Sequence, residues 1–208
     1  LHLSIRRQRQ MCIRDRARAA QAYPIKGFTH YVKGGDDGSW YLGDEGTRFF
    51  EAAQELELIA SLAIGADLQP VVKELASRFP GVPFLCHHMA GARVGDVDRL
   101  RTICDSAAVA NVYIKMSGFA YAMPDRKWEY PYHETHDVIK GLYEAYGPNR
   151  MCWGADYPVV RNYMTYQHSL EAFRSHCDFI PDGDRETILG GALKVLLDAA
   201  CKVEIGES

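Results

Sequence analysis

The chain has 208 residues, of which 47% are hydrophobic and 25% are charged, and its formal net charge is −3. This composition is typical of a globular protein with a substantial core. The small net charge predicts neither nucleic acid nor an anionic membrane as a partner, and no apolar run approaches the ~20 residues of a membrane span. The six cysteines lack CxxC pairing, which argues against a zinc ribbon and predicts reduced thiols in the cytoplasm.

The first sixteen residues differ from the rest of the chain. They hold five arginines and one aspartate and show no sustained hydrophobic periodicity. They also lack the apolar region and small-residue cleavage site of a secretory leader. We therefore expect residues 1–16 to be a leader foreign to the domain, with residues 17–208 forming the C-terminal part of one domain.

Strand-like and helical patterns alternate after this segment. The strand-like runs are residues 25–31, 58–65, 83–88, 111–118 and 151–157. Between them, apolar residues recur at helical spacing, as at Phe49, Phe50 and Ala53. Each repeat has the size of a βα unit, so the pattern predicts an α/β fold with a parallel sheet, either open or closed into a barrel.

Several of these runs end in polar or small residues. In the fourth run, period-two alternation places Val112, Ile114 and Met116 on one face. Lys115 and Ser117 then share the other face. Polar groups at the carboxyl ends of strands are typical of a (β/α)8 barrel, but such a barrel has eight strands in about 250 residues. The five runs predict either a smaller open sheet or the C-terminal part of a barrel.

Four stretches together resemble the amidohydrolase-related family, closest to its lactonase-like branch of sugar lactonases and pyrone-dicarboxylate lactonases. NVYIKMSG at 111–118 resembles the family's NVxxKxSG strand, and YGPNRMCWGADYP at 146–158 resembles its closing strand, fGpdRlmwGSDwP. RFPGVPFLCHHMAG at 78–91 is similar to rFPdvpfvldHlg, and ILGGA at 188–192 is similar to iLggnA. The order and spacing of these motifs make the resemblance specific, and it extends from about residue 24 to 197.

The resemblance implies a partial (β/α)8 TIM barrel, in which the five strands are strands 4 to 8 and the first three are missing. The family's first strand carries an HxH pair that nothing here matches, and that part would lie upstream. The run 58–65 contains no histidine, so a binuclear metal site is not expected. Thr29 stands where some relatives carry an arginine that anchors a substrate carboxylate.

Asp156 and His88 are the candidate catalytic residues. A carboxylate at the end of the last strand can take a proton from a water molecule that attacks an ester or amide carbonyl, and the family's catalytic aspartate falls at this position. A turn or helix cap before Pro158 is the structural alternative. Neighbouring strand residues point to opposite faces, so only one of His87 and His88 should line the barrel. The resemblance favours His88, as a group that polarises the carbonyl.

Other residues are candidate substrate contacts. They are Lys115, Ser117, His30, Tyr31, Arg93 and His87. Lys115 can hold a substrate carboxylate or neutralise Asp156, and a structural ion pair is an equal alternative. Aromatic residues in the loops after the strands, Trp128 and Tyr121 among them, are candidates for the wall of a pocket or for surface packing.

The predicted reaction is hydrolysis of a small lactone, or a related cyclic ester or amide, by water that Asp156 activates. The sequence leaves two cofactor states open, none or one divalent metal such as Zn²⁺ on His88 and Asp156. A zinc-dependent decarboxylase of the same superfamily and an inactive fragment are the alternatives. The predicted partner is a small-molecule substrate. The sequence does not determine the oligomeric state, and a homo-oligomer is one of the alternatives.

Overall fold

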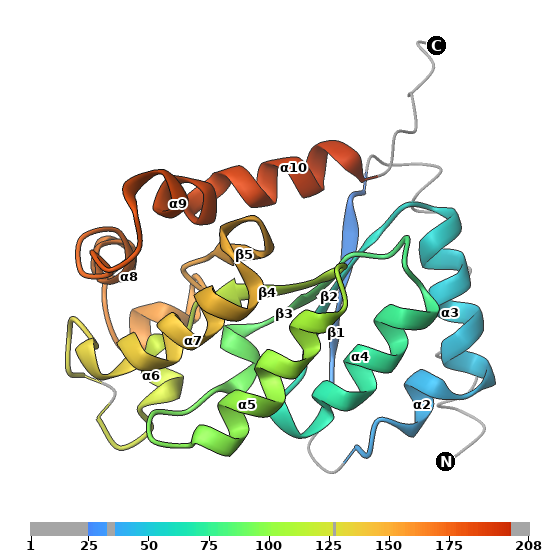
Figure 1. The fold of residues 1–208 in the computed structure, drawn as a ribbon, viewed down its shortest axis with the longest axis horizontal. Helices are drawn as coiled ribbons and strands as arrows, with labels where there is room; N and C mark the ends of the chain where they lie inside the picture. Colours follow the sequence, from blue (N-terminus) through green and yellow to red (C-terminus); the bar gives the residue numbers. More distant parts are fainter. Residues whose placement is uncertain (1–24, 33–35, 127, 201–208) are drawn as a thin grey trace.

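The computed structural model describes residues 25–32, 36–126 and 128–200. At its centre is a five-stranded parallel sheet in the order β1-β2-β3-β4-β5 (Figure 1). The strands are β1 (Gly27–Tyr31), β2 (Ile59–Ala63), β3 (Phe84–Cys86), β4 (Val112–Met116) and β5 (Met151–Trp153). Each strand pairs with the next one along the chain, which confirms the predicted run of βα repeats. The segment 1–16 lies outside the described residues.

The helices between and after the strands are short, with the longest covering twelve residues. They are α2 (Ser39–Leu42), α3 (Asp44–Glu55), α4 (Gln69–Arg78), α5 (Val97–Asp105), α6 (Phe119–Ala122), α7 (His136–Tyr146), α8 (Tyr166–Arg174), α9 (Asp182–Glu186) and α10 (Ala192–Ala199). Turns η2 (His88–Gly91) and η6 (Val159–Asn162) follow β3 and β5. In the described part of the chain, no helix combines the length and apolar character needed to cross a bilayer.

The outer face of the sheet is covered by helices. Phe50 of α3, Leu75 of α4, Ile103 of α5 and Leu142 of α7 are buried in one core together with Ile114 of β4. Each of these apolar side chains contributes about 1.5–3 kcal/mol when it leaves water. The apolar periodicity of the helices therefore holds them on this face.

The inner face of the sheet carries a second, smaller core. Leu85 of β3 and Cys152 of β5 are buried there against Leu196 of α10. Lys26, just before β1, donates a hydrogen bond from Nζ to the carbonyl of Ala200 at 2.6 Å. Helix α10 thus covers the part of the inner face near the strand starts, whereas the polar residues lie farther along the strands.

The predicted alternation of β4 is confirmed. Val112, Ile114 and Met116 are fully buried on the outer face, and Tyr113 packs on the inner core. Strands β3, β4 and β5 are shorter than the runs that predicted them because the polar and small residues at their carboxyl ends turn out of the ladder. The last inter-strand bond at β3 runs from the His87 amide to the Leu62 carbonyl at 2.9 Å.

Candidate active site

Asp156 lies three residues beyond the end of β5. Its backbone is left-handed, with φ of 58°, a conformation that costs a non-glycine residue about 1 kcal/mol or more. Its carbonyl accepts the amide hydrogen of Val160 at 3.0 Å, which fixes the turn into η6. The side chain is 23% exposed and lies between two donors from the segments that follow β3 and β4. This position keeps the carboxylate partly accessible while neighbouring groups orient it.

Tyr121 of α6 is the nearer of these two donors. Its hydroxyl donates to Asp156 Oδ2 at 2.5 Å. Burial, together with the Asp156 carboxylate, raises the pKa of Tyr121 above its usual value. The phenol therefore stays protonated and remains a donor at neutral pH.

His88 is the second partner of Asp156. Its Nε2 lies 3.7 Å from Asp156 Oδ1, and its Nδ1 lies 3.0 Å from the hydroxyl oxygen of Ser117. Burial lowers the pKa of His88, and the nearby Lys115 lowers it further, while Asp156 opposes both effects. The imidazole is therefore neutral at neutral pH. A proton on Nε2 directs an N–H toward the carboxylate, and the Ser117 hydroxyl then donates to Nδ1.

His87 faces the same region. Its Nε2 lies 2.6 Å from the hydroxyl of Ser61, and its ring centroid is 5.4 Å from that of His88. Burial lowers the pKa of His87 to about 3, with contributions from Lys115 and His88. The expectation that only one histidine lines the inner side is wrong. His87 follows the strand alternation, whereas His88 has a φ of 49° and turns back toward the site.

Lys115 brings a cation to this group of residues. It lies on the inner face of β4, half-buried. Burial lowers the pKa of Lys115, and the charge of Asp156 opposes this shift. An ammonium group in a partly dry site interacts more strongly with an anion than it would in water. Lys115 can therefore stabilise negative charge that develops near Asp156.

Gly118 leaves room for the Tyr121 ring beside Asp156. Its φ is 72°, and a Cβ atom built there would lie 2.4 Å from Tyr121 Cδ2 and 3.2 Å from His88 Cβ. A side chain at this position would displace the Tyr121 ring. The contact of Tyr121 with Asp156 could not be predicted from the sequence, because a side chain that returns across a left-handed glycine leaves no periodic signal. The spacing Gly118 to Tyr121 after a strand is the one available cue.

The other sequence candidates are placed in different surroundings. Tyr31 is 71% exposed, and its ring centroid lies 6.1 Å from that of His87. His30 points to the outer face, where its ring stacks on Trp40 at 5.3 Å. Arg93 is exposed in the segment between η2 and α5. The structure thus brings Asp156, His88, Lys115, Ser117 and His87 together and leaves His30 on the opposite face; the functional roles remain predictions.

The described residues do not form a metal site by themselves. A catalytic zinc ion takes three protein ligands, and no three His, Cys, Asp or Glu side chains of the described residues are grouped to hold one. His88 Nε2 and Asp156 Oδ1 offer two donors on one side. His87 Nε2 is engaged by Ser61, and the Lys115 ammonium disfavours a second cation nearby.

Most of the chain matches the model of a known protein family. The model described as amidohydrolase matches residues 4–196, which is most of the chain. The chain belongs to the amidohydrolase family. The match begins within the segment 1–16 that the sequence analysis set apart. No curated protein matches this amidohydrolase-family chain.

Solved structures show the same fold at low identity. An amidohydrolase from Burkholderia multivorans with bound zinc has a TM-score of 0.73 and 18% identity, over 83% of this chain and 64% of that chain. A protein described as a 2-pyrone-4,6-dicarboxylic acid hydrolase, from Pseudomonas putida, has a TM-score of 0.69 and 16% identity, over 86% and 65%. A 5-carboxyvanillate decarboxylase from Sphingomonas paucimobilis has a TM-score of 0.64 and 15% identity, over 89% and 62%.

This amidohydrolase-family chain spans less than two thirds of the length of these three structures. Its five parallel strands and their helices form part of a (β/α)8 barrel, which confirms the predicted fold. In such barrels the active site lies at the carboxyl ends of the strands. The group around Asp156 lies at this end of β3, β4 and β5.

Proposed function

We propose that this chain carries the acid–base half of a hydrolase site that opens a small lactone, or a related cyclic ester or amide. One observation carries the proposal. Asp156 lies at the carboxyl end of the last strand, where it is held by the Tyr121 hydroxyl at 2.5 Å and faces His88 Nε2 at 3.7 Å. A partly exposed carboxylate that is oriented by neutral donors is suited to receive a proton from water.

The reaction follows from these groups. Asp156 accepts a proton from a water molecule while the water oxygen bonds to the ring carbonyl carbon, and the carbonyl electron pair moves to its oxygen. The Lys115 ammonium stabilises this oxyanion, and a well-placed donor of this kind is worth on the order of 3 kcal/mol. When the carbonyl re-forms, the ring C–O bond breaks, and Asp156 returns its proton to the leaving alkoxide. The product is the open-chain hydroxy acid.

The neighbours of Asp156 act by positioning it. Tyr121 donates a hydrogen bond to Asp156 Oδ2 and His88 Nε2 faces Oδ1 at 3.7 Å, so the carboxylate is oriented by the segments that follow β4 and β3. Ser117 fixes the ring of His88 through Nδ1. Orientation of this kind lowers the entropic part of the barrier.

The test is the hydrolysis of two lactones, δ-gluconolactone and 2-pyrone-4,6-dicarboxylate. The rate of hydrolysis is measured from the protons that the reaction releases. The second lactone is chosen from the name given to the P. putida protein. We expect Asp156→Asn to lower turnover by about 10²–10⁴-fold, while Asp98→Asn, at an exposed position on α5, leaves it unchanged. Equal turnover in Asp156→Asn, or no turnover by the chain, contradicts the proposal. Release of carbon dioxide from 5-carboxyvanillate would instead assign a decarboxylase.

A further inference from the structure

The turn η2, which brings His88 to Asp156, has an unusual backbone. Four consecutive residues are left-handed, with φ of 49° at His88, 52° at both Met89 and Ala90, and 72° at Gly91. Only glycine adopts this conformation without a steric cost. Residues of other types keep it only where the surrounding structure holds them, and they are frequent at functional sites. The groups that hold η2 therefore determine where the His88 ring lies.

Part of this support comes from within the turn and from the core. The Ala90 amide donates to the carbonyl of His87 at 2.8 Å, and the Ala92 amide donates to the carbonyl of Met89 at 3.1 Å. The side chains of Met89 and Ala90 are buried in the main core. These contacts anchor the middle of the turn. At its end, Gly91 has no side chain, so a neighbour can hold it only through its backbone.

Arg99, in the first turn of α5, contacts this end of η2. Its Nε donates to the carbonyl of Gly91 at 2.7 Å. The Arg99 side chain is 20% exposed, and its Nη1 lies 3.5 Å from Oδ1 of Asp67, in the turn η1 (Ala66–Leu68). Because the Asp67 side chain is exposed, this ion pair contributes little. A hydrogen bond from a guanidinium to a partly buried carbonyl is stronger than one between neutral groups, so the bond to Gly91 is the main contact.

The position of Arg99 is fixed independently of η2. Asp96 Oδ1 accepts the amide hydrogen of Arg99 at 3.0 Å and so caps the start of α5. Arg99 Nη2 lies 3.6 Å from a Cβ built at Gly91 and 3.7 Å from one built at Gly65. Since Gly65 follows β2 and Gly91 follows β3, the guanidinium lies against the segments that follow both strands. An arginine anchored in this way on α5 can hold η2 in its left-handed form.

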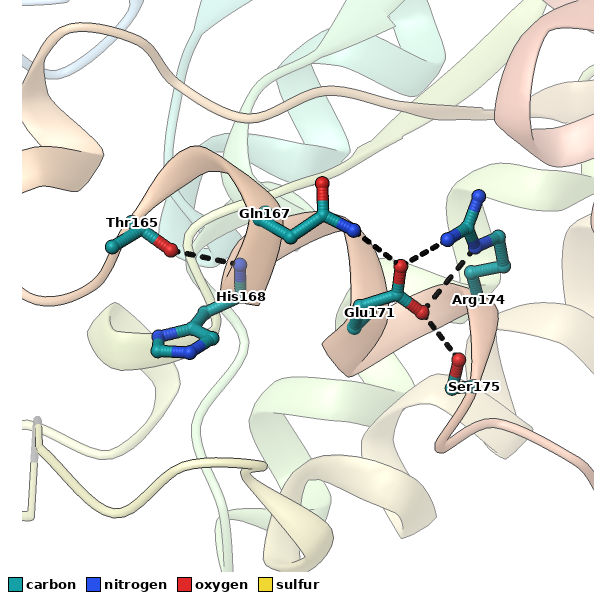
Figure 2. A network of polar contacts seen from close by, with 6 residues as sticks. All are labelled: Thr165, Gln167, His168, Glu171, Arg174 and Ser175. Atoms are coloured by element: carbon teal, nitrogen blue, oxygen red, sulfur yellow. Dashed lines mark hydrogen bonds and ion pairs between the residues drawn. The ribbon is translucent and has the colours of Figure 1, made fainter.

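Arg174 of α8 provides a contrast. Figure 2 shows it beside Glu171 of the same helix, which also accepts hydrogen bonds from Gln167 at 2.7 Å and from Ser175. These four residues belong to α8 or follow it directly. The loss of Arg174 should therefore affect this helix alone, which makes Arg174 the matched control for Arg99.

We propose that Arg99 is a positioning residue of the active site, which holds the left-handed turn η2 and thereby keeps the His88 ring at Asp156. The inference rests on the proposed hydrolase function, in which His88 helps to orient the Asp156 carboxylate. Arg99 acts through the Gly91 carbonyl and not on the substrate. Without it, Asp156 would keep Tyr121 as an orienting neighbour but lose the fixed position of His88, and fewer of its orientations would be productive.

Amide hydrogen exchange of the full chain measures the turn directly. The amides of Ala90 and Ala92 report on η2, and the amide of Ser169, bonded in the first turn of α8, reports on a distant helix. Arg99→Met keeps an apolar stem and removes the donors. We expect it to accelerate exchange at Ala90 and Ala92 by about tenfold and to leave Ser169 unchanged. Arg174→Met should leave Ala90 and Ala92 unchanged.

Turnover tests whether the turn positions His88. On the lactone that the chain hydrolyses faster, Arg99→Met should lower kcat by about tenfold and leave KM unchanged. Arg99→Lys keeps the charge and a donor, so it should restore most of the lost kcat. In a His88→Gln background, Arg99→Met should cause no further loss, because the group that Arg99 positions is gone. A role in overall stability alone would lower turnover in both backgrounds.

The outcomes separate this inference from the proposed function. If exchange accelerates at Ala90 and Ala92 alone but the chain hydrolyses no lactone, the role of Arg99 in holding η2 stands and the hydrolase proposal fails. The inference is overturned if Arg99→Met leaves exchange in η2 unchanged, if it accelerates exchange equally at Ser169, or if it lowers kcat equally with and without His88. If Arg99→Met does not fold, Arg99→Lys replaces it. A smaller acceleration that is confined to η2 then supports the inference, and no acceleration overturns it.

Discussion

The contact between Gly118 and Tyr121 allows a direct test of how the site is built. In Gly118→Ala the new Cβ would lie 2.4 Å from Tyr121 Cδ2 and 2.9 Å from Tyr121 Cε2, so the ring must move. A left-handed backbone, here with φ of 72°, costs alanine about 1–2 kcal/mol, and overpacking adds about 1–3 kcal/mol. We therefore expect the free energy of unfolding to fall by about 2–5 kcal/mol in total.

A matched substitution separates these two costs. Gly95 also has a left-handed backbone, with φ of 81°, but no atom lies within 4 Å of a Cβ built there. Gly95→Ala should therefore lose only the conformational part, about 1–2 kcal/mol. Urea unfolding monitored by circular dichroism measures both variants. The difference between them is the cost of displacing Tyr121.

A double-mutant cycle identifies the displaced group. In a Tyr121→Ala background the clash with the ring is absent and only the 3.2 Å approach to His88 Cβ remains, so Gly118→Ala should cost little more than Gly95→Ala does. This corresponds to a coupling of about 1–3 kcal/mol between positions 118 and 121. Equal losses for Gly118→Ala and Gly95→Ala in the unaltered background would refute this reasoning. So would a Gly118→Ala loss that is independent of Tyr121.

Further predictions concern stability, pH and thiol reactivity. The Asn111 side chain donates from Nδ2 toward the carbonyls of Ala76, Phe79 and Val82, so Asn111→Ala should destabilise the fold by about 1–3 kcal/mol in urea unfolding; a loss no larger than that of an exposed alanine substitution contradicts this. The pKa of His87 is about 3 in the folded state, below its ordinary value of 6.5. Between these two pH values the unfolded chain binds a proton at His87 and the folded chain does not, so the free energy of unfolding falls as the pH falls below 6.5. At about pH 5 this difference costs about 2 kcal/mol, and unfolding curves at several pH values should show a smaller pH dependence in His87→Gln. Burial raises the pKa values of the Cys86 and Cys177 thiols to about 12, so these two thiols should react with a maleimide only on unfolding; their rapid labelling in the native protein would disagree with the described core.

The sheet and the facing of its residues could be predicted from the sequence because strand periodicity is a local property. The alternation in β4 places Lys115 on the inner face, and its apolar neighbours are buried on the other face. The same rule predicts the inner side for Asp156. That residue, however, lies beyond the end of β5 with a left-handed backbone, so period-two alternation accounts for Lys115 but not for the position of Asp156.

The close contacts of the site could not be predicted in this way because they depend on turns outside regular elements. His88 reaches Asp156 through a residue with positive φ, and Tyr121 returns across Gly118. His30 shows the opposite case. It is a polar residue near a strand end, yet the alternation of β1 directs it to the outer face, where Trp40 stacks on it.

The central claim is that Asp156 activates water for attack on a ring carbonyl, and turnover in ¹⁸O-enriched water tests it most directly. The account predicts that hydrolysis of 2-pyrone-4,6-dicarboxylate places one ¹⁸O atom in the newly formed carboxylate, detected by mass spectrometry, and that Asp156→Asn forms this labelled product about 10²–10⁴-fold more slowly. A product without the label, or labelling at an unchanged rate in Asp156→Asn, would contradict it.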